Sequence, residues 1–354
     1  MKIIHAIFTF MTGGSETMLV DIINHQCKEA SVALIVVNDK INPDLLKTLD
    51  KNVAVYLLGR TAGAKSQLLP TYFKIRKIVN RMKPDVIHCH DNNLFPFFIR
   101  WKQKTFLTIH SVQLSTAFLK NYRQVFAIST PVKADIKKRT GIEAKMIYNG
   151  ITIKEYQSRN RYDFDPEQEI FQIIQISRLD PVQKGQDIAI QSMRLLKEQH
   201  PGIRFHFDFV GDGDALEELQ ALVTQNNLQN EVLFVGQVDR NWIKTHLQNY
   251  HLLIQPSLIE GFGLTIIEGF ACGLPVIASD LYGPEEICRT LDAGLLVHPN
   301  DPVDLAKKIY QVYQSYTSNT LKDTNYCLQD KNRMSLFDIQ TTAKTYMDNY
   351  IIKT

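Results

Sequence analysis

Two glutamates eight residues apart, Glu260 and Glu268, lie on either side of a glycine-rich turn in the second half of the chain. The turn comes directly after the apolar run 252–255, which predicts a buried strand, and it leads into a short predicted helix. The turn residues are Gly261, Phe262, Gly263 and Leu264. Ligands of open α/β sheets bind at the carboxyl ends of strands, and helix N-termini offer N–H groups to phosphates. The pattern therefore predicts a site for a phosphate-containing ligand.

Glu268 also has a structural interpretation, because Thr265-x-x-Glu268 is the pattern of a capping box. In that motif, the glutamate at the third helical position bonds back to the cap of the helix. Glu260 has no such role, because it precedes the predicted helix and needs solvent or a ligand. The sequence alone leaves both interpretations of Glu268 open.

Two cations follow the predicted strand 171–176 in the same half of the chain. Arg178 offers a planar fork of N–H donors and Lys184 offers a compact charge, so the two suit a diphosphate. Most Arg and Lys pairs are simply surface charge. The residues alone leave both interpretations of this pair open.

A glycine pair, Gly13-Gly14, separates the predicted strand 2–10 from the predicted helix 17–28. Helix N-termini bind anions, and glycine allows the backbone to approach a ligand closely. The pair is therefore a candidate phosphate cradle. Glycine pairs more often mark only a turn, so this pattern does not decide the matter alone.

Three histidines lie at the ends of predicted strands in the first half of the chain. His88 and His90 end strand 84–90 on one face of it, and His110 lies at the end of strand 106–111. A His-x-His pair can bind a metal ion, but no further group of ligands accompanies it, so we expect no metal site. His110 could instead be a structural residue near a strand end, with its hydrogen bonds satisfied within the protein.

The ordered motif 256–278 resembles the E-x7-E signature of family 4 nucleotide-sugar glycosyltransferases, which are retaining enzymes with the two-domain GT-B fold. The resemblance implies that Glu260 faces the donor sugar and that Glu268 binds the ribose hydroxyls of the nucleotide. It also implies that Arg178 and Lys184 hold the diphosphate.

The same resemblance assigns roles to residues of the first half. Gly13-Gly14 would lie close to the donor phosphates, His110 close to the donor sugar, and His90 in the interdomain cleft. The donor would also contact the turn residues Gly261, Phe262, Gly263 and Leu264. The family needs no metal ion and no other cofactor, because cations and helix N-termini stabilise the leaving diphosphate.

The length of 354 residues exceeds one ordinary core, so two domains are expected. Strand–turn–helix alternation in both halves predicts an α/β protein with two doubly wound, Rossmann-like domains that face a cleft. We place an acceptor-binding domain at 1–153, a polar linker at 154–169 and a nucleotide-sugar domain at 170–334. By resemblance, the last helix, 335–354, crosses back to the first domain.

Composition restricts the function and the location. The formal net charge of +3 is too small to favour nucleic acid, and no apolar run reaches the ~18 residues of a membrane span. Five cysteines without C-x-x-C spacing favour reduced thiols in the cytoplasm. The predicted helix 67–82 is basic, which usually means a solvated face, and the alternative is peripheral contact with the inner face of the membrane.

The expected activity is therefore that of a retaining, metal-independent glycosyltransferase of the hexosyltransferase type. Its donor would be a nucleotide sugar, with a UDP-sugar favoured, and its acceptor a hydroxyl of a glycan or lipid-linked oligosaccharide in bacterial surface polysaccharide synthesis. Two alternatives remain: a nucleotide-sugar epimerase of the same fold, or a non-catalytic nucleotide-sugar-binding subunit that needs a partner. A hydride-transfer enzyme is disfavoured, because no G-x-G-x-x-G follows the first strand.

Overall fold

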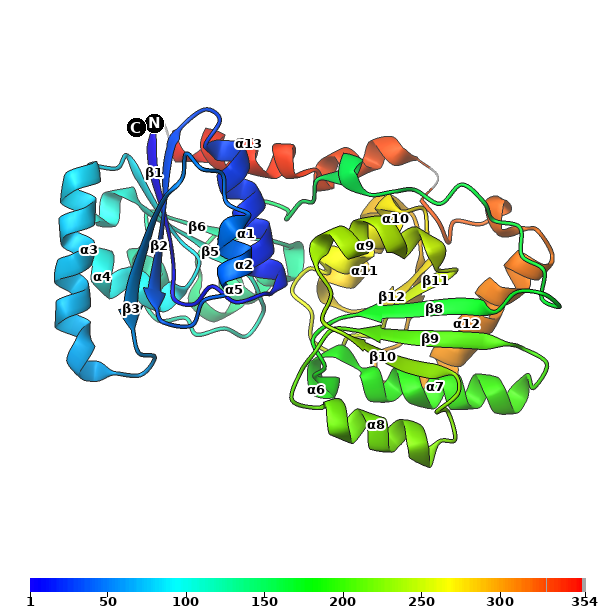
Figure 1. The fold of residues 1–354 in the computed structure, drawn as a ribbon. Coiled ribbons are helices and arrows are strands. Elements are labelled where there is room, and N and C mark those ends of the chain that lie inside the picture. The colour runs from blue at the N-terminus through cyan, green and yellow to red at the C-terminus, as the bar shows by residue number, and fades with distance from the viewer. Residues whose placement is uncertain (329, 352–354) are drawn as a thin grey trace. The chain divides into compact units, whose positions relative to one another are not determined.

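The computed structural model describes residues 1–328 and 330–351, and they form two α/β units (Figure 1). One unit consists of Met1–Thr152 together with Leu336–Thr354, and the other consists of Ile153–Ser335. The last three residues of the predicted helix 335–354, and Gln329 of the predicted second domain, lie outside the described residues.

The first unit is built on a sheet of seven parallel strands in the order β3-β2-β1-β4-β5-β6-β7. Its inner strands are continuously apolar, as in β2, because helices cover both faces of a parallel sheet. The strands are β1 (Lys2–Ile7), β2 (Ser31–Asn38), β3 (Ala54–Arg60), β4 (Val86–Cys89), β5 (Thr105–Ile109), β6 (Gln124–Ala127) and β7 (Lys145–Met146).

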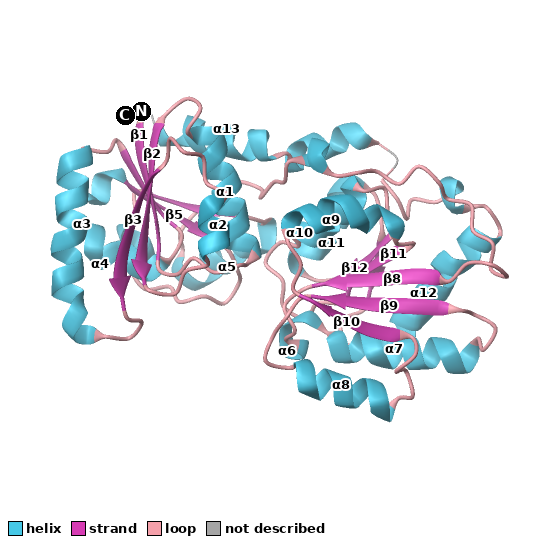
Figure 2. Cartoon of the chain, in the orientation of Figure 1, coloured by secondary structure: helices cyan, strands magenta, loops and turns pink. Residues whose placement is uncertain are grey.

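The helices of this unit follow the strands in regular alternation (Figure 2). They are α1 (Gly14–Gln26), α2 (Pro43–Lys47), α3 (Leu68–Met82), α4 (Phe95–Phe98), α5 (Thr130–Thr140) and α13 (Ile339–Tyr350), with short 3-10 turns at Lys65–Gln67, Asn92–Leu94, Ile99–Lys104 and Leu119–Asn121. The first helix begins at Gly14 and not at residue 17, so the glycine pair forms the helix start itself.

The second unit has a sheet of six parallel strands in the order β10-β9-β8-β11-β12-β13. The strands are β8 (Phe171–Ile176), β9 (Phe205–Val210), β10 (Val232–Gly236), β11 (Leu252–Gln255), β12 (Val276–Ser279) and β13 (Leu295–Val297). The helices are α6 (Pro181–Lys184), α7 (Gln186–Gln199), α8 (Leu216–Gln225), α9 (Arg240–His246), α10 (Leu264–Ala271), α11 (Tyr282–Leu291) and α12 (Pro302–Thr317), with 3-10 turns at Ile153–Glu155, Leu247–Asn249 and Leu321–Asp323. A further 3-10 turn, Lys331–Phe337, spans the boundary between the two units. The predicted α/β class with two doubly wound, Rossmann-like domains is confirmed.

No helix in the described part of the chain has the length and apolar composition that a bilayer crossing requires.

The stretch predicted as a linker, 154–169, packs against the second unit. The N–H of Gln157 donates to the carbonyl of Lys244 over 2.9 Å, and the N–H of Arg159 donates to the carbonyl of Cys272 over 2.7 Å. These backbone bonds attach the segment to helices α9 and α10. At least its first part is therefore a structural element of this unit.

The C-terminal helix α13 supplies side chains to the core of the first unit. Tyr346 is fully buried, and the hydroxyl of Thr108 on β5 donates to its hydroxyl over 3.0 Å. The hydroxyl of Tyr350 lies 2.6 Å from Nδ1 of His88 on β4. The predicted return of the last helix to the first domain is thus confirmed, and this helix completes the buried hydrogen bonding of the sheet.

We expect Tyr346→Ala to lower the free energy of unfolding of the first unit by about 3–5 kcal/mol, because it empties a large buried site. Urea denaturation followed by circular dichroism would measure the change. The exposed Lys344→Ala, on the same helix, should stay within about 0.5 kcal/mol of wild type. Equal effects of the two substitutions would show that α13 is not part of the core.

Candidate functional site

The strand order of each sheet reverses at one place. In the first sheet the reversal lies between β1 and β4, and in the second it lies between β8 and β11. The loops after two such strands leave in opposite directions, and this is where open α/β sheets bind ligands. Gly13-Gly14 follows β1 and His90 follows β4, while Lys184 follows β8 and Glu260 follows β11. Residues predicted from the sequence therefore lie at both reversal points.

An ion pair joins the loops at the reversal point of the second sheet. Nζ of Lys184 lies 2.7 Å from Oε2 of Glu260, and the two side chains are only 18% and 21% exposed. Lys184 is the last residue of α6, a single turn whose N-terminus is capped by the carboxylate of Asp180. A cation and a carboxylate are thus held together in a partly desolvated place, where their charges act more strongly than in water.

The backbone brings these two loops into direct contact. The carbonyl of Gln183 accepts the N–H groups of Leu258 and Ile259, at 2.8 and 3.0 Å. Gly185 has a φ of +64°, and a Cβ on it would lie 2.2 Å from the carbonyl oxygen of Pro256. Only glycine fits there, because a side chain would push the loop that carries Lys184 away from the loop that carries Glu260.

Arg178 lies beside this pair in sequence but is more open, with a side chain that is 64% exposed. Its guanidinium bonds to the carboxylate of Asp180 over 3.0 Å. A guanidinium carries five N–H donors, so this contact leaves capacity for an anionic ligand. The start of this loop packs closely against Gly211, because a Cβ on Gly211 would lie only 2.0 Å from the carbonyl oxygen of Ser177.

The capping-box interpretation of Glu268 is wrong. Gly263 is the cap of α10, so Thr265 is the second helical residue and Glu268 the fifth, beyond the reach of that motif. The carboxylate of Glu268 is nearly buried and accepts a hydrogen bond from the hydroxyl of Tyr156 over 2.7 Å. Burial, together with the charge of Glu268, raises the pKa of Tyr156 well above its ordinary value, so its hydroxyl remains a donor.

Tyr156 escaped the sequence analysis because it lies in the predicted linker, 112 residues before its partner. No local spacing relates the two residues. Only the docking of the segment on the second unit brings them together.

The glycine pair of the first unit has a carboxylate close by. Gly13 is the cap of α1, and Oε2 of Glu16 lies 2.6 Å from where a Cβ on Gly13 would be. Burial raises the pKa of Glu16, and the hydroxyl of Ser15 donates to its carboxylate over 2.7 Å. A phosphate at this helix start would meet that carboxylate, whose charge would oppose the binding of an anion.

Three buried histidines and the partly buried His110 form a cluster at the reversal point of the first sheet. His5 on β1 pairs in register with His88 on β4, and His90 and His110 follow the ends of β4 and β5. Burial lowers the pKa of His5 and of His110 to about 4, and it lowers the pKa of His88 and of His90 well below the ordinary range. All four are therefore neutral at pH 7. The sequence analysis missed His5, although a histidine inside an apolar strand is the signal that could have revealed it.

Three of these histidines are of the type and spacing that can bind a metal ion. Side-chain nitrogens of His5, His88 and His90 lie within 4.8 Å of one another, and neutral imidazoles are common zinc ligands. However, Nδ1 of His88 already bonds to Tyr350 and Nε2 of His88 to Thr108, at 2.6 and 2.8 Å. The geometry thus satisfies His88 by hydrogen bonds within the protein.

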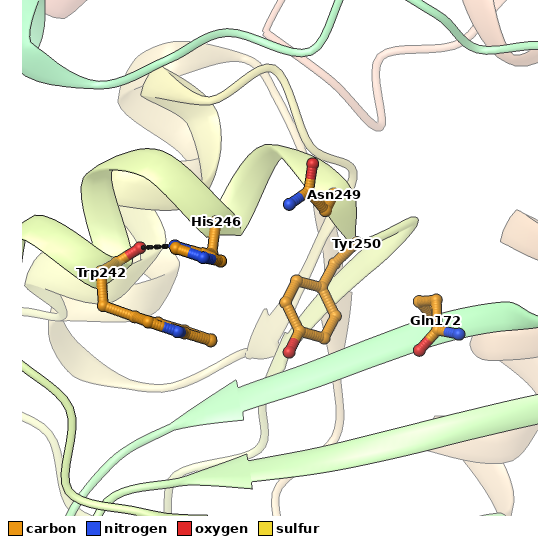
Figure 3. A pocket seen from close by; sticks show the side chains of 5 residues that line it. All are labelled: Gln172, Trp242, His246, Asn249 and Tyr250. Atoms are coloured by element: carbon orange, nitrogen blue, oxygen red, sulfur yellow. Dashed lines mark hydrogen bonds between the residues drawn. The ribbon is translucent and has the colours of Figure 1, made fainter.

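A small pocket of about 190 Å³ lies in the second unit, away from the ion pair (Figure 3). Its lining residues are Gln172, Trp242, His246, Asn249 and Tyr250. Gln172 is near the start of β8, so this pocket is at the opposite end of that strand from Arg178. It is separate from the site predicted from the sequence.

Comparisons with known proteins agree with this architecture. Residues 12–155 match the family described as Glycosyltransferase Family 4, and residues 157–326 match the family described as Glycosyl transferases group 1. The crystal structure of Anabaena HepE in complex with UDP and glucose superimposes with a TM-score of 0.81 at 22% identity, and 99% of each chain is covered. The fold is thus the GT-B fold of glycosyltransferases.

Relatives in sequence cover less of the chain. An uncharacterized glycosyltransferase of Methanocaldococcus jannaschii is 29% identical over 54% of this chain, which spans half of that protein's length. The amylovoran biosynthesis glycosyltransferase AmsK of Erwinia amylovora is 30% identical over 40% of this chain and 36% of its own. Together with the two family matches, which cover most of the chain, these relatives identify it as a glycosyltransferase. Its second half carries the group 1 glycosyltransferase domain and its first half the Family 4 domain.

The buried histidines should make stability depend on pH. The pKa of such a histidine is 6.5 in the unfolded chain and about 4 in the folded chain. At a pH between these two values, the histidine is neutral in the folded protein and takes up a proton when the protein unfolds. The free energy of unfolding therefore falls as pH falls through this window, by about 2 kcal/mol per histidine between pH 7 and pH 5. Urea denaturation at the two pH values should show a smaller loss for His5→Phe than for wild type. An identical loss would contradict the assignment of His5 as a buried neutral base.

Proposed function

We propose that this protein is a retaining glycosyltransferase that moves a sugar from a nucleotide-sugar donor to a hydroxyl of a glycan or lipid-linked oligosaccharide. The setting that we propose is bacterial surface polysaccharide synthesis at the cytoplasmic side of the membrane. The observation that carries the proposal is the Lys184–Glu260 pair at the reversal point of the second sheet. In this proposal the cation would bind a phosphate of the donor, and the carboxylate beside it would bind hydroxyls of the sugar.

The diphosphate of the donor would bind to Arg178 and Lys184. Because the leaving diphosphate gains negative charge as the bond to the sugar breaks, fixed cations and amides stabilise the transition state more than the ground state. The turn residues Gly261, Phe262, Gly263 and Leu264 would add backbone contacts at the start of α10, and Gly13-Gly14 would approach the phosphates from the first unit. No metal ion takes part in this proposal.

The two glutamates would bind different parts of the donor. Glu260 would accept hydrogen bonds from the sugar, and Glu268 would accept them from the ribose hydroxyls while Tyr156 holds its carboxylate in place. A UDP-sugar is the favoured donor. The binding of UDP and glucose by the structurally similar HepE supports that choice.

The proposed reaction needs no nucleophile from the protein. In the proposed reaction, a phosphate oxygen of the leaving group takes the proton of the acceptor hydroxyl, and the anomeric configuration is retained. His110, with its pKa lowered to about 4, is neutral at pH 7. It would contact the donor sugar by a hydrogen bond and not as a charge.

Nucleotide binding tests the donor site. In a thermal-shift panel of UDP, GDP, ADP and CMP, we expect UDP at ~100 times its dissociation constant to add about 2.7 kcal/mol of stability. Lys184→Met and Glu268→Gln should lose that shift. The control Lys197→Met removes a different ion pair, with Glu231, and should keep it. If UDP shifts every variant equally, the assigned residues do not form the site.

Turnover separates the proposal from its alternatives. A transferase releases UDP and forms a product only with an acceptor, and NMR of that product should show the donor's anomeric configuration. An epimerase would alter the sugar without any acceptor. A chain that binds UDP without turnover until a partner protein is added would be a subunit of a larger transferase.

A pocket of about 400 Å³ in the first unit supports an acceptor with an apolar part. It lies at the carboxyl ends of β1 and β3, the end at which ligands bind. Its lining is mostly apolar: Phe8, Arg60, Leu68, Leu69, Tyr72, Asn93, Pro96 and Phe97. Nε of Arg60 is buried without a partner in the described part of the chain, so the pocket also offers a donor to an anionic or hydroxyl group.

The helix beside this pocket supports contact with a membrane surface. On α3, Leu69 and Phe73 are 64% and 54% exposed, and Lys77 and Arg81 continue the same stripe at four-residue spacing. No acidic residue occurs in segment 51–84, which has eight basic ones: Lys51, Arg60, Lys65, Lys74, Arg76, Lys77, Arg81 and Lys83. Apolar anchors beside basic side chains suit an anionic bilayer.

Vesicle binding tests this contact. Each basic side chain near an anionic surface contributes about 1 kcal/mol, so Lys77→Gln with Arg81→Gln should weaken co-sedimentation with anionic phospholipid vesicles about 30-fold. The control double variant Lys133→Gln, Lys138→Gln on α5 removes the same charge and should bind like wild type. Equal weakening of both would mean that only net charge matters.

A further inference from the structure

Three histidines and one glutamine form a continuous chain of hydrogen-bond contacts through the first unit. Oε1 of Gln26 lies 2.8 Å from Nε2 of His5, and Nδ1 of His5 lies 3.0 Å from Nε2 of His90. Nδ1 of His90 lies 3.3 Å from Nε2 of His110. The chain runs from the end of α1, across β1, to the loops after β4 and β5.

The direction of these hydrogen bonds follows from the orientation of the Gln26 amide, whose oxygen faces His5. A neutral imidazole carries one N–H donor and one acceptor, and burial keeps these rings neutral at pH 7. The amide oxygen of Gln26 only accepts, so Nε2 of His5 carries hydrogen and Nδ1 of His5 accepts. Nε2 of His90 must then donate to His5, and by the same rule Nε2 of His110 donates to Nδ1 of His90. Nδ1 of His110 is left as an acceptor.

That last nitrogen is buried and has no hydrogen-bond partner among the described residues. A buried acceptor without a partner costs free energy, and such atoms mark places that a ligand or water completes. His88, although its ring lies 4.5 Å from that of His90, uses both of its nitrogens in hydrogen bonds with Tyr350 and Thr108.

We propose that Gln26, His5 and His90 are positioning residues that hold His110 in the Nε2–H tautomer, so that its Nδ1 accepts a hydrogen bond from a hydroxyl of the sugar substrate. The hydroxyl rests on the proposed function, whereas the tautomer is a property of the free protein. A glutamine on α1 thereby determines which hydrogen-bonding group His110 presents, although the two side chains do not touch.

Two other arrangements of the same residues make different predictions. If the Gln26 amide is turned, its NH₂ donates to His5, every bond in the chain reverses, and Nδ1 of His110 carries the hydrogen. If a metal ion binds to His5, His88 and His90, the nitrogens that hold it carry no hydrogen, and the chain is broken at His5.

Nitrogen-15 NMR of histidine-labelled free protein at pH 7 decides among them. Each ring nitrogen gives a resonance typical of either a protonated or an unprotonated nitrogen, and comparison with His110→Gln assigns the signals of His110. We expect an unprotonated Nδ1 and a protonated Nε2. A protonated Nδ1 overturns the proposal, and so does stoichiometric zinc in the purified protein by elemental analysis.

Variants show whether the hydrogen bonds from Gln26 through His5 and His90 set the tautomer of His110. In His5→Phe, His90 loses the acceptor that orients it, so the His110 signals should move toward a mixture of tautomers. Thr108→Val removes a hydrogen bond of the neighbouring His88 network and should leave the His110 signals unchanged. If His5→Phe also leaves them unchanged, His5 does not position His110.

Ligand addition tests the hydroxyl. UDP-glucose should shift the Nδ1 resonance of His110, because that nitrogen then accepts a hydrogen bond, whereas UDP alone should not. A bound UDP-glucose that leaves the resonance in place overturns this part of the proposal. Failure of UDP itself to bind would instead refute the proposed donor site. The tautomer measured on the free protein does not depend on UDP binding, so that result would remain valid.

Discussion

The close approach of two backbone segments is the constraint on which the second unit's site depends. The loop after β8 and the loop after β11 touch where Gly185 meets the carbonyl of Pro256. That contact is possible only because glycine has no Cβ and adopts a φ of +64° at little cost. The side chains of Lys184 and Glu260 are therefore close enough to form their ion pair. The ion pair is a consequence of backbone packing, which is why it can be both partly buried and well formed.

The two units differ in the electrostatic character of their ligand ends. The second unit presents ions: Arg178, Lys184 and the two glutamates, with helix α10 starting beside them. The first unit presents neutral rings, because burial removes the positive charge from all four histidines of its cluster. Charges suit a diphosphate, whereas neutral donors and acceptors suit hydroxyls. The second unit thus offers charged groups at its ligand end, and the histidine cluster of the first offers neutral hydrogen-bonding groups.

Local patterns predicted the strands and most of the candidate site, because both depend on short-range periodicity and on residues that follow strand ends. The strand 171–176 and the strand 252–255 have the predicted bounds, and Arg178, Lys184 and Glu260 follow them as expected. The capping-box interpretation of Glu268 failed for a local reason. Gly263 begins the helix two residues earlier than a threonine cap would, and the motif's spacing cannot show which residue is the cap.

The sequence by itself determined the fold class, the two-domain plan and the strand-end positions of the ligand-binding candidates. The strands and helices follow from periodicity within short windows, and the two domains follow from the length of the chain. Only the tertiary structure decided which distant side chains complete the site. Tyr156 reaches Glu268 from the predicted linker, Tyr350 reaches His88 from the last helix, and Gln26 reaches His5 from α1. Hydrogen bonds between such residues leave no periodic trace in the chain, because they depend on how whole elements pack and not on the spacing within any one of them.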